Sequence, residues 1–356
     1  MTVLYITYID FSDCDSGNYL RPARMYEAFL REGHSVYLLS GEQERNAWKE
    51  RKRKVAETEK WLDSHTPDIC YIESPVYPIL LTCDYRLIRR IHAMGIPMGY
   101  FYRDFYFKFP DLYPKRTGVS NRMKDAWLMF LQRRTDRLLK RVDIVYFPSR
   151  GCTELFPYAD MRPLPPAAEI HPIGKGEGRS CIYVGGLGGH YGGKTLLEAF
   201  RILNAGEESF PLLLVCRESE WKQYADEWGK EPWLEVHHAS GDALLPLYAR
   251  AALAVLPIEK NRYTDFAVNV KLFEYMSYGL PIAATSVREI GSLIRENGLG
   301  RADAENADTL AREICDMLAD ESAMAQWRQN CETVLREKHL WIHRVRQIVR
   351  ELGEKR

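Results

Sequence analysis

A glycine-rich stretch, residues 183–194 (YVGGLGGHYGGK), lies between an apolar run and a helical pattern. Glycines such as Gly186 and Gly188 let a ligand approach the backbone, and the free amides and dipole at the start of the next helix favour phosphate. The dinucleotide-binding fingerprint is not matched, because Tyr191 stands where it needs a third glycine. The stretch predicts a pyrophosphate site, and a flexible turn is the alternative interpretation.

A second stretch, residues 263–285 (YTDFAVNVKLFEYMSYGLPIAAT), places a carboxylate on a helix. Its apolar spacing predicts a helix from about residue 270 to 278, which Gly279 and Pro281 end before the next strand. An amphipathic helix explains the apolar residues but not Glu274 among them. Glu274 is therefore a candidate for binding a ligand.

Both stretches belong to series in which apolar runs alternate with helical patterns. Strands are expected at about 3–9, 36–39, 69–72, 97–102 and 144–147, and again at 181–185, 212–216, 234–237, 253–257 and 281–284. Strands separated by helices of this length predict parallel sheets. A stretch rich in proline and glycine, about 161–178, predicts a linker. The fold class is therefore α/β, with two Rossmann-like domains and a cleft between the carboxyl ends of their sheets.

The start of the chain, the glycine-rich stretch with its following LLEAF, and KLFEYMSYGLP at 271–281 resemble the GT-B glycosyltransferases, especially family 4. The resemblance implies an N-terminal acceptor domain at 1–165 and a C-terminal nucleotide-sugar donor domain at 175–338. It also implies that a last helix, 340–356, crosses back to the first domain. In that family the glutamate at the position of Glu274 binds the ribose hydroxyls. A carboxylate suits this role because it can accept a hydrogen bond from each of two adjacent hydroxyls.

The sequence departs from the family at two places. The family often has a second glutamate eight residues before the first, where this chain has Phe266, with Asp265 beside it as a candidate substitute. The family's basic pair on the glycine loop falls near Gly186 and Tyr191, which carry no charge. The negative charge of the pyrophosphate must then be balanced by other cations or by the helix dipole. The predicted donor-binding residues are Glu274, Lys271, Gly186, Gly188, Lys194, Arg217 and Asn269.

The acceptor side is expected in the first domain. GT-B enzymes place a glycine-containing loop after the first strand, where this chain has Gly17 and Asp13. Residues 13–15 also read as the DxD metal signature of the other glycosyltransferase fold. Their position after the first strand argues against that role, and neither a metal nor another cofactor is predicted.

Arg103 and Asp104 follow the apolar run that ends at residue 102, so they should point into the cleft. Asp104 is a candidate acid, base or acceptor-orienting residue. The alternative is a capping aspartate paired with its own arginine. The predicted catalytic residues are Asp104, Asp13 and Asp265.

Residues 103–141 interleave aromatic and basic side chains, with nine Lys and Arg against two Asp between 115 and 141. A helix of this kind can lie on an anionic membrane, where a lipid-linked acceptor would need it. The alternatives are a core helix with a solvated basic face and, less favoured, single-stranded nucleic-acid binding. No nucleic-acid motif accompanies the segment, and no nucleic-acid partner is predicted.

The composition fits a two-domain globular protein. The chain has 356 residues, 46% hydrophobic and 28% charged, with no apolar run near the roughly 20 residues of a membrane span. The N-terminus lacks a secretory signal, and the eight scattered cysteines show no metal spacing. We expect a cytoplasmic protein, peripheral on the inner face of the plasma membrane.

The expected reaction is a hexosyl transfer, in which a sugar moves from a UDP-sugar or GDP-sugar donor to a hydroxyl group. The acceptor is expected to be a glycan or lipid-linked precursor of a bacterial surface polysaccharide. The resemblance implies retention at the anomeric carbon, whereas a carboxylate base at Asp104 or Asp13 would imply inversion. A sugar-nucleotide epimerase of the same fold and a catalytically silent scaffold subunit stay open as alternatives.

Overall fold

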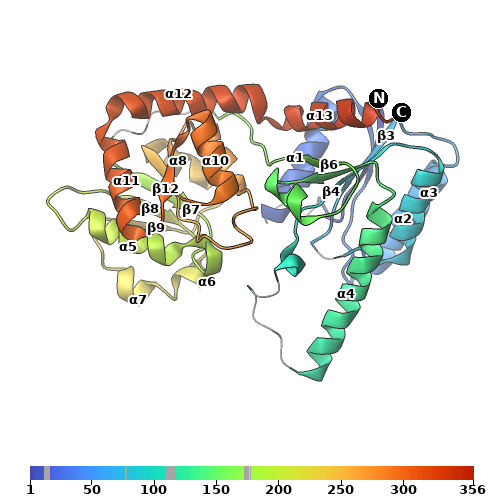
Figure 1. Cartoon of the computed structure of the whole chain (residues 1–356), viewed down its shortest axis with the longest axis horizontal. Helices are drawn as coiled ribbons and strands as arrows, with labels where there is room; N and C mark the ends of the chain where they lie inside the picture. Colours follow the sequence, from blue (N-terminus) through green and yellow to red (C-terminus); the bar gives the residue numbers. More distant parts are fainter. Residues whose placement is uncertain (12–16, 77, 110–111, 113–117, 172–175, 177) are drawn as a thin grey trace. The chain divides into compact units, whose positions relative to one another are not determined.

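The computed structural model describes residues 1–11, 17–76, 78–109, 112, 118–171, 176 and 178–356. The chain divides into two compact units (Figure 1). The first contains Met1–Pro165 and Trp341–Arg356, and the second contains Pro166–Leu340. Of the helices in these ranges, none combines the length and hydropathy that a membrane span needs.

Unit 1 is built on a six-stranded parallel sheet in the order β2-β1-β3-β4-β5-β6. Its strands are β1 (Thr2–Ile6), β2 (Ser35–Leu39), β3 (Ile69–Glu73), β4 (Met98–Phe101), β5 (Ile144–Phe147) and β6 (Met161–Pro163). Its helices are α1 (Gly17–Arg31), α2 (Trp48–Trp61), α3 (Thr82–Ala93), α4 (Val119–Leu139) and α13 (Trp341–Gly353). Strands β3, β4 and β5 are buried at every residue, as parallel strands covered on both faces are.

The predicted linker is wrong at its start, where β6 pairs with β5 at the edge of the sheet. Sequence patterns missed this strand because it has three residues and ends in Pro163, which only an edge strand tolerates.

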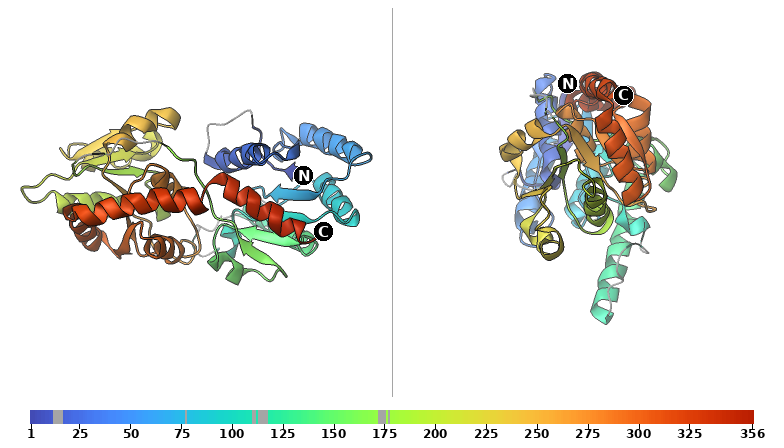
Figure 2. Two further views of the ribbon diagram at one scale, coloured as in Figure 1. Left: turned by 90° about the horizontal axis from the view of Figure 1, so that it is seen from above. Right: turned by 90° about the vertical axis from the view of Figure 1, so that its left-hand side faces the viewer.

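The last helix, α13, packs beside α1 and over β3 and β4 (Figure 2). Its apolar face buries Trp341, Val345 and Leu352. A Cβ on Gly99 of β4 would lie 2.8 Å from the Tyr146 ring and 3.1 Å from the Leu352 side chain, so the glycine makes room for both.

Unit 2 is built on a second six-stranded parallel sheet, in the order β12-β11-β10-β7-β8-β9. Its strands are β7 (Cys181–Val184), β8 (Leu212–Val215), β9 (Leu234–His237), β10 (Leu253–Leu256), β11 (Ile282–Thr285) and β12 (Gly300–Ala304). Its helices are α5 (Gly193–Leu203), α6 (Glu218–Trp221), α7 (Ala225–Trp228), α8 (Leu245–Arg250), α9 (Val270–Ser277), α10 (Arg288–Asn297), α11 (Ala307–Ala319) and α12 (Glu321–Lys338).

Two apolar layers cover the faces of this sheet. Helices α5 and α11 contribute to one, and α8, α9, α10 and α12 contribute to the other. Strand order reverses between β7 and β10, so the helices that follow these two strands lie on opposite faces. Such a reversal opens a crevice at the carboxyl ends of the strands, where parallel sheets bind ligands.

Residues 218–228 form two short helices, α6 and α7, and between them the Tyr224 hydroxyl donates to the carbonyl of Leu187. One strand of unit 2 differs from the sequence prediction. Strand β12 was not predicted, because GRADA contains no apolar run. It forms by pairing with β11, where a Cβ on Gly300 would lie 2.1 Å from the Ile282 carbonyl oxygen.

Candidate functional site

The glycine loop and the end of β10 meet at the strand-order reversal of unit 2. Gly192 ends the loop with φ +72°, and a Cβ there would lie 1.6 Å from the carbonyl oxygen of Pro257. No side chain fits this position. The glycine therefore serves close packing of two backbone segments at the ligand-binding edge.

Helix α9 begins at this edge, and the residue just before it, Asn269, caps its first turn. The Asn269 side-chain oxygen accepts a hydrogen bond from the Lys271 amide at 2.9 Å. An Asn at this position satisfies one of the helix's unpaired amides. The structure thus gives Asn269, a predicted donor-binding residue, a local role in starting the helix that carries Glu274.

The Glu274 carboxylate is held from two sides. The Tyr248 hydroxyl donates to Oε1 at 2.5 Å, and the Lys271 ammonium lies 2.6 Å from Oε2. The side chains of Glu274 and Lys271 are 22% and 25% exposed. Each carboxylate oxygen has two lone pairs, so each can accept one further hydrogen bond from a ligand. The arrangement is a fixed, partly exposed acceptor with a cation beside it.

Tyr248 is fully buried, and the sequence did not identify it. Its ring stacks on Tyr278 with centroids 4.0 Å apart, and Tyr278 stacks on His171 at 4.8 Å. Burial, followed by the charge of Glu274, raises the pKa of Tyr248 well above its usual value, so the phenol keeps its proton. The only signal in the sequence is a tyrosine on the apolar face of a short helix, where a hydroxyl needs a partner.

The predicted cations beside the glycine loop are exposed. The side chain of Lys194 is 75% exposed with Glu198 3.7 Å away, and that of Arg217 is 82% exposed with Glu220 3.6 Å away. Exposed pairs of this kind contribute little to stability, so both cations can turn toward an anion.

The glycine loop itself is bound to neighbouring side chains. The Leu187 amide donates to the Glu220 carboxylate at 2.7 Å, and the Tyr183 hydroxyl donates to the Gly186 carbonyl. A Cβ on Gly186 would lie 2.8 Å from the Tyr191 ring, whereas Gly188 has open space around it. One amide of the loop is therefore already paired with a carboxylate rather than presented to a phosphate.

Asp265, the candidate substitute for the family's second glutamate, is a loop residue that contacts the start of α10. Its carboxylate accepts a hydrogen bond from the Arg288 amide at 3.3 Å, and its carbonyl accepts one from Glu289. The Arg288 guanidinium in turn lies 5.5 Å from the centroid of the Phe266 ring. Asp265 thus ties its loop to the next helix.

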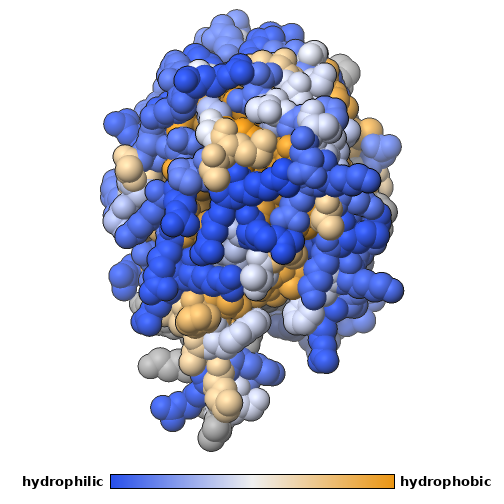
Figure 3. Space-filling view, turned by 90° about the vertical axis from the view of Figure 1, so that its right-hand side faces the viewer, coloured by the Kyte–Doolittle hydropathy of each residue, from blue (hydrophilic) through white to orange (hydrophobic). Residues whose placement is uncertain are grey.

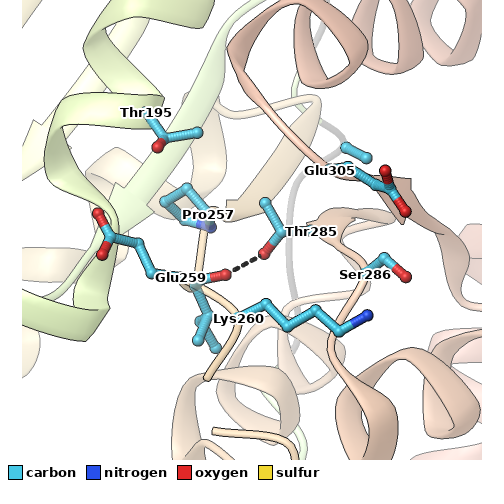
Figure 4. A pocket seen from close by; sticks show the side chains of 9 residues that line it. Thr195, Pro257, Glu259, Lys260, Thr285, Ser286 and Glu305 are labelled. Atoms are coloured by element: carbon cyan, nitrogen blue, oxygen red, sulfur yellow. Dashed lines mark hydrogen bonds between the residues drawn. The ribbon is translucent and has the colours of Figure 1, made fainter. Parts of the chain in front are cut away.

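A pocket of about 350 Å³ opens at the carboxyl ends of β10, β11 and β12 (Figure 4). Its lining residues are Thr195, Pro257, Ile258, Glu259, Lys260, Thr285, Ser286, Ala304 and Glu305. The Thr285 hydroxyl donates to the Ile258 carbonyl at 2.5 Å. Glu274 and Lys271 are not in the lining, which carries two carboxylates against one ammonium. This charge suits a pyrophosphate less well than the surroundings of Glu274 do.

In unit 1, Arg103 and Asp104 follow β4 and pair with each other at 3.3 Å. Such a pairing was one part of the alternative interpretation, which also made Asp104 a capping residue. Burial raises the pKa of Asp104, and the charge of Arg103 partly opposes the shift. Gly17 begins α1, while Asp13 lies outside the described residues.

A buried ion pair that the sequence did not reveal lies near the carboxyl end of β3. Arg21 Nε is 3.2 Å from Glu73 Oε1, the Tyr71 hydroxyl donates to the same oxygen, and the Arg21 guanidinium lies 3.6 Å from the centroid of the Phe101 ring. The side chains of Arg21 and Glu73 are 8% and 2% exposed. A glutamate at the end of the apolar run ICYIE was the available signal.

Residues 178–320 match the family model described as glycosyl transferases group 1. A search of curated protein sequences finds no match. Among solved structures, the chain is similar to WaaG, a glycosyltransferase involved in lipopolysaccharide biosynthesis, at 16% identity and TM-score 0.62, covering 98% of this chain and 99% of that one.

It is also similar to WaaB, a lipopolysaccharide outer core galactosyltransferase, at 14% identity and TM-score 0.63, covering 99% of each chain. An α-glucosyltransferase solved with UDP and a DNA 13-mer matches at 10% identity and TM-score 0.64, again covering 99% of each chain. These findings confirm the predicted resemblance and the GT-B fold. The protein is a glycosyltransferase that carries a group 1 domain over residues 178–320.

Proposed function

We propose that unit 2 binds a nucleotide-diphosphate sugar through Glu274 and that the enzyme transfers the sugar to a hydroxyl acceptor. The observation that carries the proposal is the Glu274 carboxylate, held by Tyr248 and Lys271 with one lone pair left on each oxygen. A ribose offers two adjacent hydroxyls that match these oxygens. Similar structures solved with UDP, one of them a pneumococcal O-GlcNAc transferase, support a nucleotide at this fold.

The diphosphate of the donor extends from the ribose toward the cations of the same edge. Lys271 lies beside Glu274, and the exposed Lys194 and Arg217 flank the glycine loop. Positive charge placed where the leaving group gains negative charge lowers the barrier of transfer. Glu274 therefore anchors the nucleoside, and the three cations stabilise the departing diphosphate.

In the proposed reaction the acceptor oxygen forms a bond to the anomeric carbon as the bond from that carbon to the diphosphate oxygen breaks. The nucleoside diphosphate leaves with the bonding electrons, and a phosphate oxygen takes the proton of the acceptor hydroxyl. This route retains the anomeric configuration and needs no carboxylate nucleophile. If Asp104 takes the proton instead, attack comes from the opposite side and the product is inverted.

The acceptor in this proposal is a glycan or a lipid-linked precursor of a bacterial surface polysaccharide. The names of WaaG and WaaB support this class. The similar α-glucosyltransferase structure contains DNA, so the fold alone does not determine the class of acceptor. For the donor, we favour a UDP sugar or a GDP sugar.

Calorimetry with UDP, GDP and ADP sugars tests the donor site. We expect the wild-type protein to bind one of them at micromolar concentration and Glu274→Ala to bind it at least about a hundredfold more weakly, because two hydrogen bonds to a charged group are lost. Glu332→Gln, an exposed glutamate of α12, is the matched control and should bind normally.

Equal donor affinity in Glu274→Ala and wild type, with equal unfolding temperatures, would overturn the proposal. Incubation with the donor alone provides a second test. Isomerisation of the sugar nucleotide without acceptor would indicate an epimerase instead of a transferase. Failure of every sugar nucleotide to bind would favour a scaffold subunit.

A further inference from the structure

Helix α4 has two parts with different surroundings. Its second part, residues 131–139, buries Leu131, Thr135, Leu138 and Leu139 in unit 1. In its first part, residues 120–130, every side chain is exposed or intermediate. We call this first part the α4 tip. It projects from unit 1 beyond the other elements of that unit (Figures 1 and 2).

Large apolar side chains lie along one side of the α4 tip. Met123, Trp127 and Phe130 are four and three residues apart, which places them on one face of a helix. They are 69%, 50% and 59% exposed. The projecting part of the surface accordingly shows apolar side chains next to hydrophilic ones (Figure 3). Adjacent exposed side chains of this size mark an interaction site.

Not every described aromatic residue of the basic segment shares this exposure, which corrects the expectation that residues 103–141 form one surface. Phe105 and Phe109 are buried in unit 1, and the Phe105 ring contacts Phe156 edge to face. The prediction treated the whole segment as one surface. The large exposed apolar side chains that share one helix face lie on the α4 tip, whereas Phe105 and Phe109 pack inside unit 1.

The charge around the α4 tip is positive. From residue 119 to 141 the chain carries seven basic residues, Arg122, Lys124, Arg133, Arg134, Arg137, Lys140 and Arg141, against Asp125 and Asp136. The carboxylate of Asp136 accepts hydrogen bonds from Gln132 and Tyr158, so these two donors partly neutralise its effect on the surface. Arg122, Lys124 and Arg133 are exposed close to the apolar face.

We propose that the α4 tip docks on a membrane surface that contains anionic lipids. A helix with Trp, Met and Phe on one face and basic residues beside them suits the interface between headgroups and acyl chains. Each basic residue near an anionic leaflet adds to the attraction, by roughly fivefold in partitioning. A second copy of the chain is the weaker occupant, because two basic helices brought together would repel each other.

This inference does not rest on the donor site, since docking requires no nucleotide. It adds a partner to the proposed function. An enzyme held at a membrane by unit 1 meets a lipid-linked acceptor in two dimensions instead of three.

Co-sedimentation with vesicles tests the proposal on the full-length protein without donor. One set of vesicles is phosphatidylcholine alone, and the other is equimolar phosphatidylcholine and phosphatidylglycerol. We expect binding to the second set only. Trp127→Ser with Phe130→Ser should reduce binding more than tenfold, because two large apolar side chains are removed. Arg122→Gln with Lys124→Gln should reduce it roughly 25-fold.

Leu245→Ser and Arg336→Gln, an exposed apolar and an exposed basic residue of unit 2, are the matched controls and should bind as wild type does. The tip variants should keep the wild-type circular dichroism, unfolding temperature and donor affinity, since no side chain of residues 120–130 is buried. A failed donor test would therefore leave this result intact.

Three outcomes would overturn the proposal. The first is no sedimentation with anionic vesicles, and the second is equal sedimentation of wild type and both tip variants. The third is a wild-type dimer in analytical ultracentrifugation that the apolar tip variant dissociates, because the face would then belong to a second copy of the chain.

Discussion

The carboxyl edges of the two sheets use their charged residues differently. In unit 1, Arg21 and Glu73 are buried and paired with each other. In unit 2, Lys194 and Arg217 are exposed, and Glu274 is partly so. A buried ion pair leaves an uncompensated charge when one partner is removed, whereas an exposed pair contributes little. We infer that the charged residues at the first edge stabilise the fold, whereas those at the second edge stay available to bind a ligand.

Arg21→Met is the strongest way to test this difference. It should lower the free energy of unfolding by about 3–5 kcal/mol, because Glu73 is left buried without its cation. Urea denaturation followed by circular dichroism measures the change. Arg24→Met, in the same helix but with an exposed partner, is the control and should change stability by less than about 1 kcal/mol. Similar losses in the two variants would show that the Arg21 pair does not hold the fold.

Tyr248→Phe tests whether the second edge is preorganised for its ligand. Loss of the hydrogen bond to Glu274 should weaken donor binding about tenfold, seen as a higher KM with a smaller change in kcat. Tyr275→Phe is the matched control, since this buried tyrosine of α9 accepts its hydrogen bond from the Val184 amide instead. Both variants should lose similar stability. Equal donor affinity in the two would show that Tyr248 supports only the fold.

Lys194→Gln and Arg217→Gln should give the smallest effects. Each should weaken donor binding a few-fold, and the difference from wild type should shrink at high salt because the cations are solvated. Titrations at low and high ionic strength measure both quantities. Lys222→Gln, an exposed lysine paired with Glu218, serves as the control. If all three variants bind alike, the diphosphate depends on Lys271 and not on the exposed cations.

Much of the fold follows from local patterns. Buried apolar runs predicted ten of the strands, and the glycine and proline after α9 marked its end. The two missed strands, β6 and β12, are short or poor in apolar residues and exist because a neighbouring strand offers backbone partners. The glycine loop lies between a strand, β7, and a helix, α5, as the sequence predicted. Its pairing with Glu220 was not foreseen, because that partner is 33 residues away.

By itself, the sequence determined that two α/β series follow each other and that Glu274 lies on the helix that follows the strand at 253–257. Those features depend on periodicity and turn residues that act over a few positions. Only the tertiary structure decided that Tyr248 and Lys271 hold Glu274, that Arg21 and Glu73 are buried together, and that the α4 tip stays exposed. Whether a side chain is buried and paired or stays exposed depends on what packs against it. Most of those neighbours are distant in the chain.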